Sequence, residues 1–259
     1  MVTTNLVGGL GNQLFQIATT LSYAYDNNID AIFCLSSHYL PNQGNNATTY
    51  QSNIFNNLKI VEEKEIKNFK VYNEPTFNYT SIPLTLTNII LSGYFQSEKY
   101  FSNNRNQIVE ILQWDMVIEN KLEEYKKLVD TPTCAVHIRR GDYLKFQHTH
   151  PALPLTYYYK SFSMFERGTS FLIFSDDIEW CKNNLDYPNL HFIDIKEDYL
   201  NLYLMSKCDN NIIANSSFSW WGAWLNTTPN KRVIAPAQWF GKSITHNTKD
   251  LIPTTWTII

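Results

Sequence analysis

Apolar residues in the second half of the chain gather in short runs, and these runs alternate with segments of helical spacing. Helical spacing is present over Thr156–Arg167, Asp198–Lys207 and Phe218–Asn226, and a shorter helix is expected to end at Leu185. Such alternation of strands and helices predicts a parallel sheet. The expected strands are Cys134–Ile138, Ser170–Ser175, His191–Ile193, Asn211–Ala214 and Arg232–Ala235.

The first half of the chain begins with an expected strand, a glycine loop and a helix. A second strand at Ala31–Ser36 would complete a βαβ unit. Polar residues with proline and glycine predict a loop over His38–Asn53. Short strands are expected near Lys70–Tyr72 and Asn88–Ser92, and Ser92–Phe101 is expected to hold a strand end, a turn and a helix start.

A break separates the two halves. Asn103–Val129 has helical character, and the proline-containing segment after it ends that pattern. We place the boundary between Asn103 and Thr133 and expect two domains, residues 1–115 and 116–259. A chain of 259 residues is long enough for two such domains.

Composition narrows the class of protein. Hydrophobic residues make up 44% of the chain and charged residues 17%, which is typical of a folded soluble protein. The net charge is −3 and there is no basic run, so we expect no nucleic-acid partner. No run approaches the roughly 18 apolar residues of a membrane span, and the first residues lack the cationic start of a signal peptide. We therefore expect neither a transmembrane segment nor a signal peptide.

Four cysteines are spread along the chain without a Cys-x-x-Cys pair. Cys34, Cys134 and Cys208 lie in or beside apolar segments, as buried thiols do. This pattern favours a reduced, cytoplasmic protein. The even number leaves disulfides open as the alternative.

Three glycines, Gly8, Gly9 and Gly11, lie between the first expected strand and its helix. Glycines there let a ligand approach the backbone, and a helix N-terminus favours anions. Their spacing matches neither the dinucleotide fingerprint nor a Walker loop, which argues against a Rossmann dehydrogenase. A tight turn without a ligand remains an equal alternative.

The most informative motif is Ala135–Tyr143, an apolar run that ends in two arginines, a glycine and an aspartate. Arginines at the carboxyl end of a buried strand lie where open α/β folds bind ligands, and a guanidinium matches phosphate oxygens. Because neighbouring strand residues face opposite sides, one arginine should face the ligand and the other should pair with Asp142. His137 shares the face of Arg139. A surface loop with structural Arg–Asp pairs is the alternative.

Two further motifs follow expected strands. Ser175, Asp176 and Asp177 suit a ribose diol or the N–H donors of guanine, although Ser175 or Asp176 could equally cap the next helix. Ser216 and Ser217 would place hydroxyl and N–H groups where a pyrophosphate binds at a helix start.

No metal-binding signature is apparent in the sequence. Asp176 and Asp177 are adjacent and should diverge, and His148 and His150 resemble a ligand pair only weakly. We expect metal-independent chemistry without a cofactor, in which arginine compensates the charge of a leaving group.

Together these motifs resemble those of the α-1,2-fucosyltransferases of glycosyltransferase family 11. Their signature, His-x-Arg-Arg-x-Asp, stands here at His137–Asp142, and the resemblance runs from residue 8 to about 240. It implies GDP-β-L-fucose as the donor, inversion at the anomeric carbon and an α-1,2 link to a terminal galactose or similar sugar. It also implies an α/β fold of two GT-B-like lobes with Rossmann-like parallel sheets. The other matching motifs are Gly8–Gln16, Ser92–Ser97, Phe174–Asp177 and Asn215–Leu225.

The resemblance also implies roles for the two domains and for single residues. Residues 1–115 would be the acceptor side and 116–259 the GDP-fucose-binding lobe. Arg139 would grip the β-phosphate and Asn12 would face the reaction centre, while Arg140 would hold the loop. The catalytic candidates are Arg139, Asp142 and Asn12, and the donor-binding candidates are His137, Arg139, Arg140, Ser175, Asp176, Asp177, Ser216, Ser217, Phe218, Gly9 and Gly11.

Several alternatives stay open. Asp142, His148 and His150 are candidates for the base that accepts the acceptor's proton. Animal members of the family carry an N-terminal membrane anchor that we expect this chain to lack, which favours a bacterial or viral form in the cytoplasm, with peripheral membrane association as the alternative. Acceptor choice is expected from His38–Asn53 and Thr76–Thr85. The alternative functions are a transferase of another donor sugar and a nucleotide-sugar-binding protein without turnover.

Overall fold

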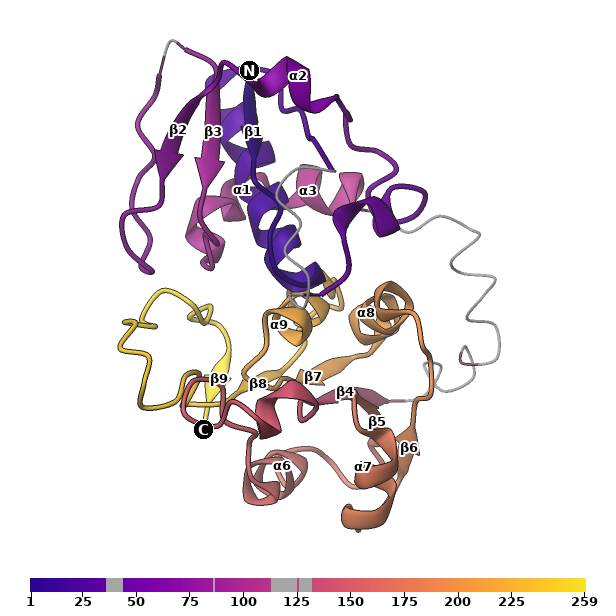
Figure 1. The fold of residues 1–259 in the computed structure, drawn as a ribbon. Coiled ribbons are helices and arrows are strands. Elements are labelled where there is room, and N and C mark those ends of the chain that lie inside the picture. Colours follow the sequence, from indigo (N-terminus) through magenta and orange to yellow (C-terminus); the bar gives the residue numbers. More distant parts are fainter. Residues whose placement is uncertain (36–43, 86, 113–124, 126–131) are drawn as a thin grey trace. The chain divides into compact units, whose positions relative to one another are not determined.

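The chain divides into two compact units (Figure 1). The computed structural model describes residues 1–35, 44–85, 87–112, 125 and 132–259. The first unit comprises Met1–Asp115 and Asn247–Pro253, and the second comprises Met116–His246 and Thr254–Ile259. The expected division at 115/116 did not anticipate that residues 247–253 return to the first unit.

A three-stranded parallel sheet, in the order β1-β3-β2, forms the centre of the first unit. Its strands are β1 (Val2–Thr4), β2 (Lys70–Asn73) and β3 (Ile89–Ser92), so the two short strands expected there are confirmed. The strand expected at Ala31–Ser36 is wrong for the residues described. Ala31 makes only an isolated bridge to Val2, and Phe33 bridges to Ile60, so the segment changes partner before a ladder can form.

Helix α1 (Leu10–Asn27) packs against β1 and is buried along most of its length. It ends at Asn28, which adopts the left-handed conformation with φ 51° and donates its N–H to carbonyls of the last turn. Helix α3 (Arg105–Ile111) confirms the first part of the helix expected over Asn103–Val129. The rest of that helix, and part of the loop His38–Asn53, lie outside the described residues. The remaining short helices are η1 (Ala47–Tyr50), α2 (Glu63–Ile66), η2 (Glu98–Tyr100) and η3 (Ser102–Asn104).

The second unit contains a six-stranded sheet in the order β6-β5-β4-β7-β8-β9, and each of its strand pairs is parallel. The expected parallel sheet is therefore confirmed. The two-residue strand β9 was not expected, because so short a strand carries no periodicity. The strands are β4 (Thr133–Ile138), β5 (Ser170–Ser175), β6 (Leu190–Phe192), β7 (Asn210–Ile212), β8 (Val233–Ala235) and β9 (Thr257–Ile258).

Helices cover both faces of this sheet (Figure 1). Helices α6 (Leu155–Phe162) and α7 (Ile178–Asn184) lie on one face, and α8 (Asp198–Lys207) and α9 (Ser217–Leu225) lie on the other. Every residue of the central strand β4 is consequently buried, as expected for a parallel strand between two helical layers.

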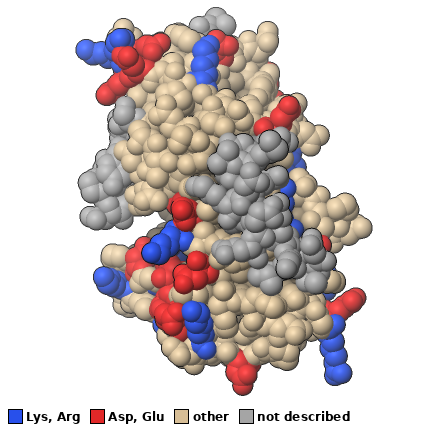
Figure 2. All heavy atoms as spheres, turned by 90° about the vertical axis from the view of Figure 1, so that its right-hand side faces the viewer, with Lys and Arg blue, Asp and Glu red and all other residues tan. Residues whose placement is uncertain are grey.

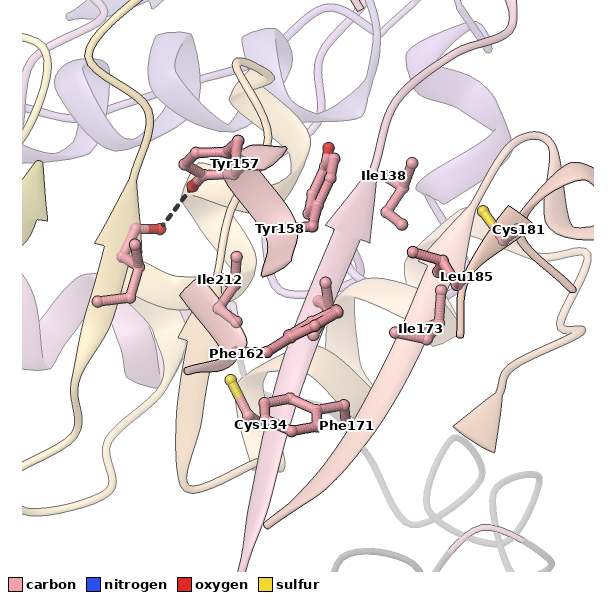
Figure 3. Close-up of a cluster of buried hydrophobic side chains, with 12 residues drawn as sticks. Cys134, Ile138, Tyr157, Tyr158, Phe162, Phe171, Ile173, Cys181, Leu185 and Ile212 are labelled. Carbon is pink, nitrogen blue, oxygen red and sulfur yellow. Dashed lines mark hydrogen bonds between the residues drawn. The ribbon is translucent and has the colours of Figure 1, made fainter. Parts of the chain in front are cut away.

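Alternate residues of β4 enter different cores. Cys134, Val136 and Ile138 join the cluster under α6 and α7, where Phe162 packs against them (Figure 3). The Tyr157 hydroxyl in this cluster donates hydrogen bonds to the carbonyls of Ile213 (2.7 Å) and Ile234 (3.3 Å), so its polar atom is satisfied inside the core. None of the four cysteines forms a disulfide, and all four are buried, which confirms the prediction for Cys34, Cys134 and Cys208 and adds Cys181 to them.

None of the helices in the described ranges combines the length and the apolar character that crossing a bilayer requires.

Candidate functional site

The order of strands in the second unit brings three of the sequence motifs together. Strands β5, β4 and β7 are neighbours and run parallel, so their carboxyl ends share one edge of the sheet. Arg139–Asp142 follows β4, Asp176 and Asp177 follow β5, and Asn215–Phe218 follows β7. Ligands of open α/β sheets bind at this edge, which makes these loops the candidate site.

Arg139 is held by two carboxylates. Its guanidinium lies 2.6 Å from the Asp142 carboxylate and 3.1 Å from that of Asp176, and it also lies over the Tyr143 ring. The expected pairing of Asp142 with Arg140 is therefore wrong. Asp142 begins the 3₁₀ turn η4 (Asp142–Leu144), and the bend at Gly141 returns its side chain to the residue three positions earlier.

Arg140 is fixed by contacts to the β5 motif. Its Nε lies 3.2 Å from the Asp177 carboxylate, and its guanidinium carbon lies 3.4 Å from the centre of the Trp180 ring. Its backbone N–H donates to Asp176. A Cβ on Gly141 would collide with the same Asp176 side chain, so glycine is required for this close approach. Through these contacts Arg140 attaches the loop after β4 to the motif after β5, and its guanidinium is already occupied by protein groups.

The cap of α7 differs from the sequence prediction. Asp177, not Ser175 or Asp176, is the N-cap, and its carboxylate accepts a long hydrogen bond of 3.4 Å from Trp180 N–H. Ser175 Oγ instead accepts from the Asp177 N–H at 3.0 Å. Asp176 cannot cap because both of its oxygens contact the β4 loop.

His137 is buried on the face of β4 that packs against α9. Its ring centre lies 5.4 Å from that of Phe218, and its Nδ1 has no hydrogen-bond partner among the described residues. Burial, with a smaller contribution from the nearby Arg139 charge, lowers the pKa of His137 to about 3. His137 is consequently neutral at physiological pH, and it can offer a hydrogen bond but no charge.

The N-terminus of α9 is open. Its N-cap residue, Ser216, makes no side-chain cap hydrogen bond within the part of the chain described, which leaves the N–H groups of the first turn available. Next to it, Tyr143 donates its hydroxyl to the Asn215 carbonyl at 3.0 Å, and burial raises the pKa of Tyr143 to about 12. Ser217 and Phe218 begin this helix, so the serine motif stands where an anion would meet the helix dipole.

The two candidate histidine bases differ in their surroundings. The His150 ring stacks on Tyr143, with ring centres 5.3 Å apart, and burial lowers the pKa of His150. The His148 carbonyl accepts from Ser243 N–H at 3.0 Å, which holds that backbone in a loop. Of the three candidate bases, Asp142 contacts Arg139 directly, and His150 contacts Tyr143, which in turn contacts Arg139.

The glycine motif belongs to the first unit. Gly8 has φ +82°, which favours glycine, and Gly9 is an N-cap without a side-chain hydrogen bond. Gly11 is buried in the first turn of α1. Asn12, in the same turn, accepts a hydrogen bond at 2.8 Å on its Oδ1 from Gln96 Nε2.

Three contacts of the candidate residues were not expected from the sequence. Tyr143 links Arg139 to the start of α9 and Trp180 stacks on Arg140 in the second unit, and Gln96 donates to Asn12 in the first. Each acts on a residue distant in sequence or through a ring contact, so no local spacing signals it. For Gln96 the only available signal is its place in the Ser92–Ser97 motif.

Charges around the site are balanced locally. Two guanidinium groups meet three carboxylates in these loops, and the acidic and basic side chains drawn in Figure 2 are interspersed rather than gathered by sign. Over the described residues, no group of three His, Cys, Asp or Glu side chains could hold a metal ion.

Known proteins resemble the chain along its whole length. The model of glycosyl transferase family 11 matches residues 1–259. An O-antigen biosynthesis glycosyltransferase, WbnK, from Escherichia coli is 32% identical, over 91% of this chain and 93% of that protein. An α-1,2-colitosyltransferase from the same species is 30% identical, over 99% and 98%. A galactoside 2-α-L-fucosyltransferase from Caenorhabditis elegans is 25% identical, over 99% and 78%.

Solved structures show the same fold at low identity. The NodZ α-1,6-fucosyltransferase soaked with GDP-fucose aligns with a TM-score of 0.54 at 12% identity, over 86% of this chain and 92% of that chain. POFUT1 in complex with GDP-fucose aligns with a TM-score of 0.55 at 12% identity, over 90% and 97%. The expected two-lobed, GT-B-like α/β class is confirmed by these similarities and by the two parallel sheets. With the family model matching throughout and two relatives at 30% identity or more, the chain belongs to glycosyl transferase family 11.

Proposed function

We propose that the chain transfers L-fucose from GDP-β-L-fucose, with inversion, to the 2-hydroxyl of a terminal galactose or similar sugar. One observation carries the proposal. The loop Arg139–Asp142, the pair Asp176 and Asp177, and the N-terminus of α9 all lie at one edge of the same sheet. Family membership supports a nucleotide-sugar donor, and the relative named as a galactoside 2-α-L-fucosyltransferase supports the linkage.

The proposed reaction breaks the bond between the sugar's C1 and the β-phosphate as the acceptor oxygen bonds to C1. GDP leaves with the electron pair, and negative charge grows on the β-phosphate. Arg139 and the N–H groups at the start of α9 would stabilise that charge more in the transition state than in the ground state. The acceptor's proton passes to a base, for which Asp142, His148 and His150 stand as the candidates. No metal is required in this scheme, because arginine and helix dipole supply the positive charge.

The remaining candidates have supporting roles in this proposal. His137 would lie against the nucleotide, Asp176 or Asp177 would read ribose or guanine, and Arg140 would hold the loop. In the first unit, Asn12 would face the reaction centre. The same unit would carry the acceptor side.

Calorimetric titration without added metal tests the donor assignment. GDP and GDP-fucose should bind to the wild-type protein more tightly than UDP. Arg139→Ala should weaken GDP binding roughly tenfold or more and lower kcat by about 10²–10³-fold. Arg232→Ala is the matched control, since Arg232 precedes β8 at the other edge of the same sheet and donates to the Met164 carbonyl. GDP binding that is indifferent to Arg139 would overturn the assignment.

A second donor deserves the same assay, because one relative is named as an α-1,2-colitosyltransferase. Colitose is L-fucose without the 3-hydroxyl, so a site that hydrogen-bonds this hydroxyl would discriminate strongly between the two sugars. Turnover of GDP-colitose in preference to GDP-fucose would replace the donor sugar and keep the rest of the proposal. NMR of the product would decide the linkage.

A further inference from the structure

The turn after β3 is held by a half-buried carboxylate, that of Glu74. Glu74 Oε2 accepts two backbone hydrogen bonds, from Tyr94 N–H at 2.8 Å and from Phe95 N–H at 3.0 Å. Phe95 has φ +52°, a left-handed conformation that a bulky side chain rarely adopts. Burial raises the pKa of Glu74. A strained residue and a desolvated carboxylate together indicate that the exact course of this turn matters for something beyond ending a strand.

The strained turn places the Gln96 side chain within hydrogen-bond distance of Asn12. Gln96 is buried, and its Nε2 donates to Asn12 Oδ1 at 2.8 Å across 84 positions of sequence. Asn12 Nδ2 is directed toward the glycine loop, where a Cβ on Gly8 would lie 2.5 Å from it. Because Gln96 donates, Asn12 must present its oxygen to Gln96 and keep its N–H donors on the side of the glycine loop.

Other hydrogen bonds already connect the same elements. Gln16, on α1, donates to the Gly93 carbonyl at 3.0 Å, and Ser97 Oγ donates to the Asp250 carbonyl at 2.6 Å. The turn is thus attached to its surroundings without Gln96. What Gln96 adds is the orientation of one amide.

We infer that Gln96 is a positioning residue: it holds the Asn12 amide with its N–H donors on the side of the glycine loop, where they can meet the transferred sugar. The inference rests on the proposed function, because it needs Asn12 to contact the donor. Glu74 acts one step further back, by fixing the backbone from which Gln96 extends.

Two substitutions of Gln96 separate positioning from stability. Gln96→Met keeps the length and removes the donor, so the Asn12 amide is left without a fixed orientation. Gln96→Glu replaces the donor by an acceptor, so Asn12 must rotate to donate and turn its oxygen toward the glycine loop. We expect kcat to fall roughly tenfold in Gln96→Met and about a hundredfold in Gln96→Glu, which is the range for losing one aligned donor. KM for the donor should change less than kcat in both variants.

The melting temperatures should show the opposite order. Gln96→Glu recovers a hydrogen bond with the rotated amide, so it should melt at or above Gln96→Met. Ser97→Ala is the matched control, because it removes a buried hydrogen bond from the next residue without touching Asn12. Its melting temperature should fall while kcat stays at the wild-type value.

The outcomes distinguish the two proposals. Wild-type protein that turns over no GDP-sugar overturns the proposed function. Wild-type turnover with kcat values that follow the melting temperatures across the three variants, or that do not change in the Gln96 variants, overturns the positioning role alone. An inverted order of kcat and melting temperature for Gln96→Glu and Gln96→Met supports it.

Discussion

His137 lies in β4 and Arg139 follows the strand two positions later, and the charge of Arg139 limits the charge of His137. Burial and the Arg139 guanidinium both disfavour the imidazolium, so His137 stays neutral in the folded protein. The neighbouring positions Val136 and Ile138 enter the opposite core. The two-residue period of a strand thus puts chemistry on one face of β4 and packing on the other.

The lowered pKa of His137 predicts a specific loss of stability in acid. The ordinary histidine pKa is 6.5 and the folded value is about 3, so the unfolded chain takes up the proton first as the pH falls. Stability is present above pH 6.5 and is lost progressively below it. Between pH 7 and pH 5, the free energy of unfolding should fall by about 2 kcal/mol more in the wild type than in His137→Gln. Urea unfolding at both pH values measures this.

His191→Gln is the matched control for that experiment, since His191 lies half-buried on β6, which β5 separates from β4. It shows how much of the change comes from replacing any histidine by glutamine. Equal slopes for wild type and His137→Gln would show that another group dominates the acid sensitivity.

At the scale of single elements, helix α9 combines a hydrophobic body with a first turn that no side chain of its N-cap residue caps among the residues described. Trp220, Trp221 and Trp224 are buried, and their burial anchors the helix without help from a cap. An N-terminus that packing alone can stabilise is free to keep its N–H groups for a ligand.

A negative charge at the start of α9 should therefore stabilise the helix and weaken the binding of GDP. Ser217→Asp places a carboxylate in the first turn, where the helix dipole favours it by about 0.5 kcal/mol. The melting temperature should stay level or rise slightly, whereas GDP affinity should fall at least roughly tenfold through repulsion of the diphosphate. Ser217→Asn is the neutral control for both measurements. Undiminished GDP binding by Ser217→Asp would remove α9 from the donor site.

The turn after β3 allows a second test at this scale. Glu74→Gln keeps one oxygen for the two N–H groups and removes the half-buried charge, so its free energy of unfolding should stay near the wild-type value. Glu74→Ala leaves both N–H groups without an acceptor and should lower it by about 2–4 kcal/mol. Urea titration of both variants decides this, and similar losses in both would mean that the charge itself is needed.

Sequence reasoning located the elements better than the contacts between them. Strand β5 and helix α8 agree with their expected bounds, because β-rich runs and polar breaks are local signals. The three loops were placed at strand ends correctly. The partner of Asp142 was wrong, because the pairing depends on a 3₁₀ turn after Gly141 that no periodicity shows. Gln96 and Asn12 are 84 positions apart, so their contact depends on how the sheet assembles.

At the scale of the whole molecule, the chain passes between its two units three times. After His246 it enters the first unit, and after Pro253 it returns to the second to form β9. Asp250 attaches the segment Asn247–Pro253 to the first unit. Its carboxylate pairs with Lys99 at 2.5 Å and accepts from Tyr79 N–H at 3.2 Å, and Lys99 lowers the pKa of Asp250.

Removing this anchor should loosen the first unit alone. In Asp250→Ala, hydrogen exchange at the Tyr79 amide should accelerate roughly tenfold, since its hydrogen bond is lost. Amides of β4 in the second unit should keep their wild-type rates. Lys249→Ala, an exposed neighbour, is the control and should change neither. Faster exchange throughout β4 would mean that the segment stabilises both units.

The two carboxylates on Arg139 carry a consequence for selectivity. The guanidinium already has its counter-ions, so if Arg139 binds the donor phosphate as proposed, that phosphate must exchange with Asp142 or Asp176 rather than fill an empty site. A small anion that binds through Arg139 alone gains little from such an exchange. A diphosphate that also reaches the start of α9, and carries a base and a sugar, can meet the cost through its other contacts. Under the proposed function, the internal ion pairs would therefore exclude inorganic phosphate and admit only a ligand that makes these further contacts.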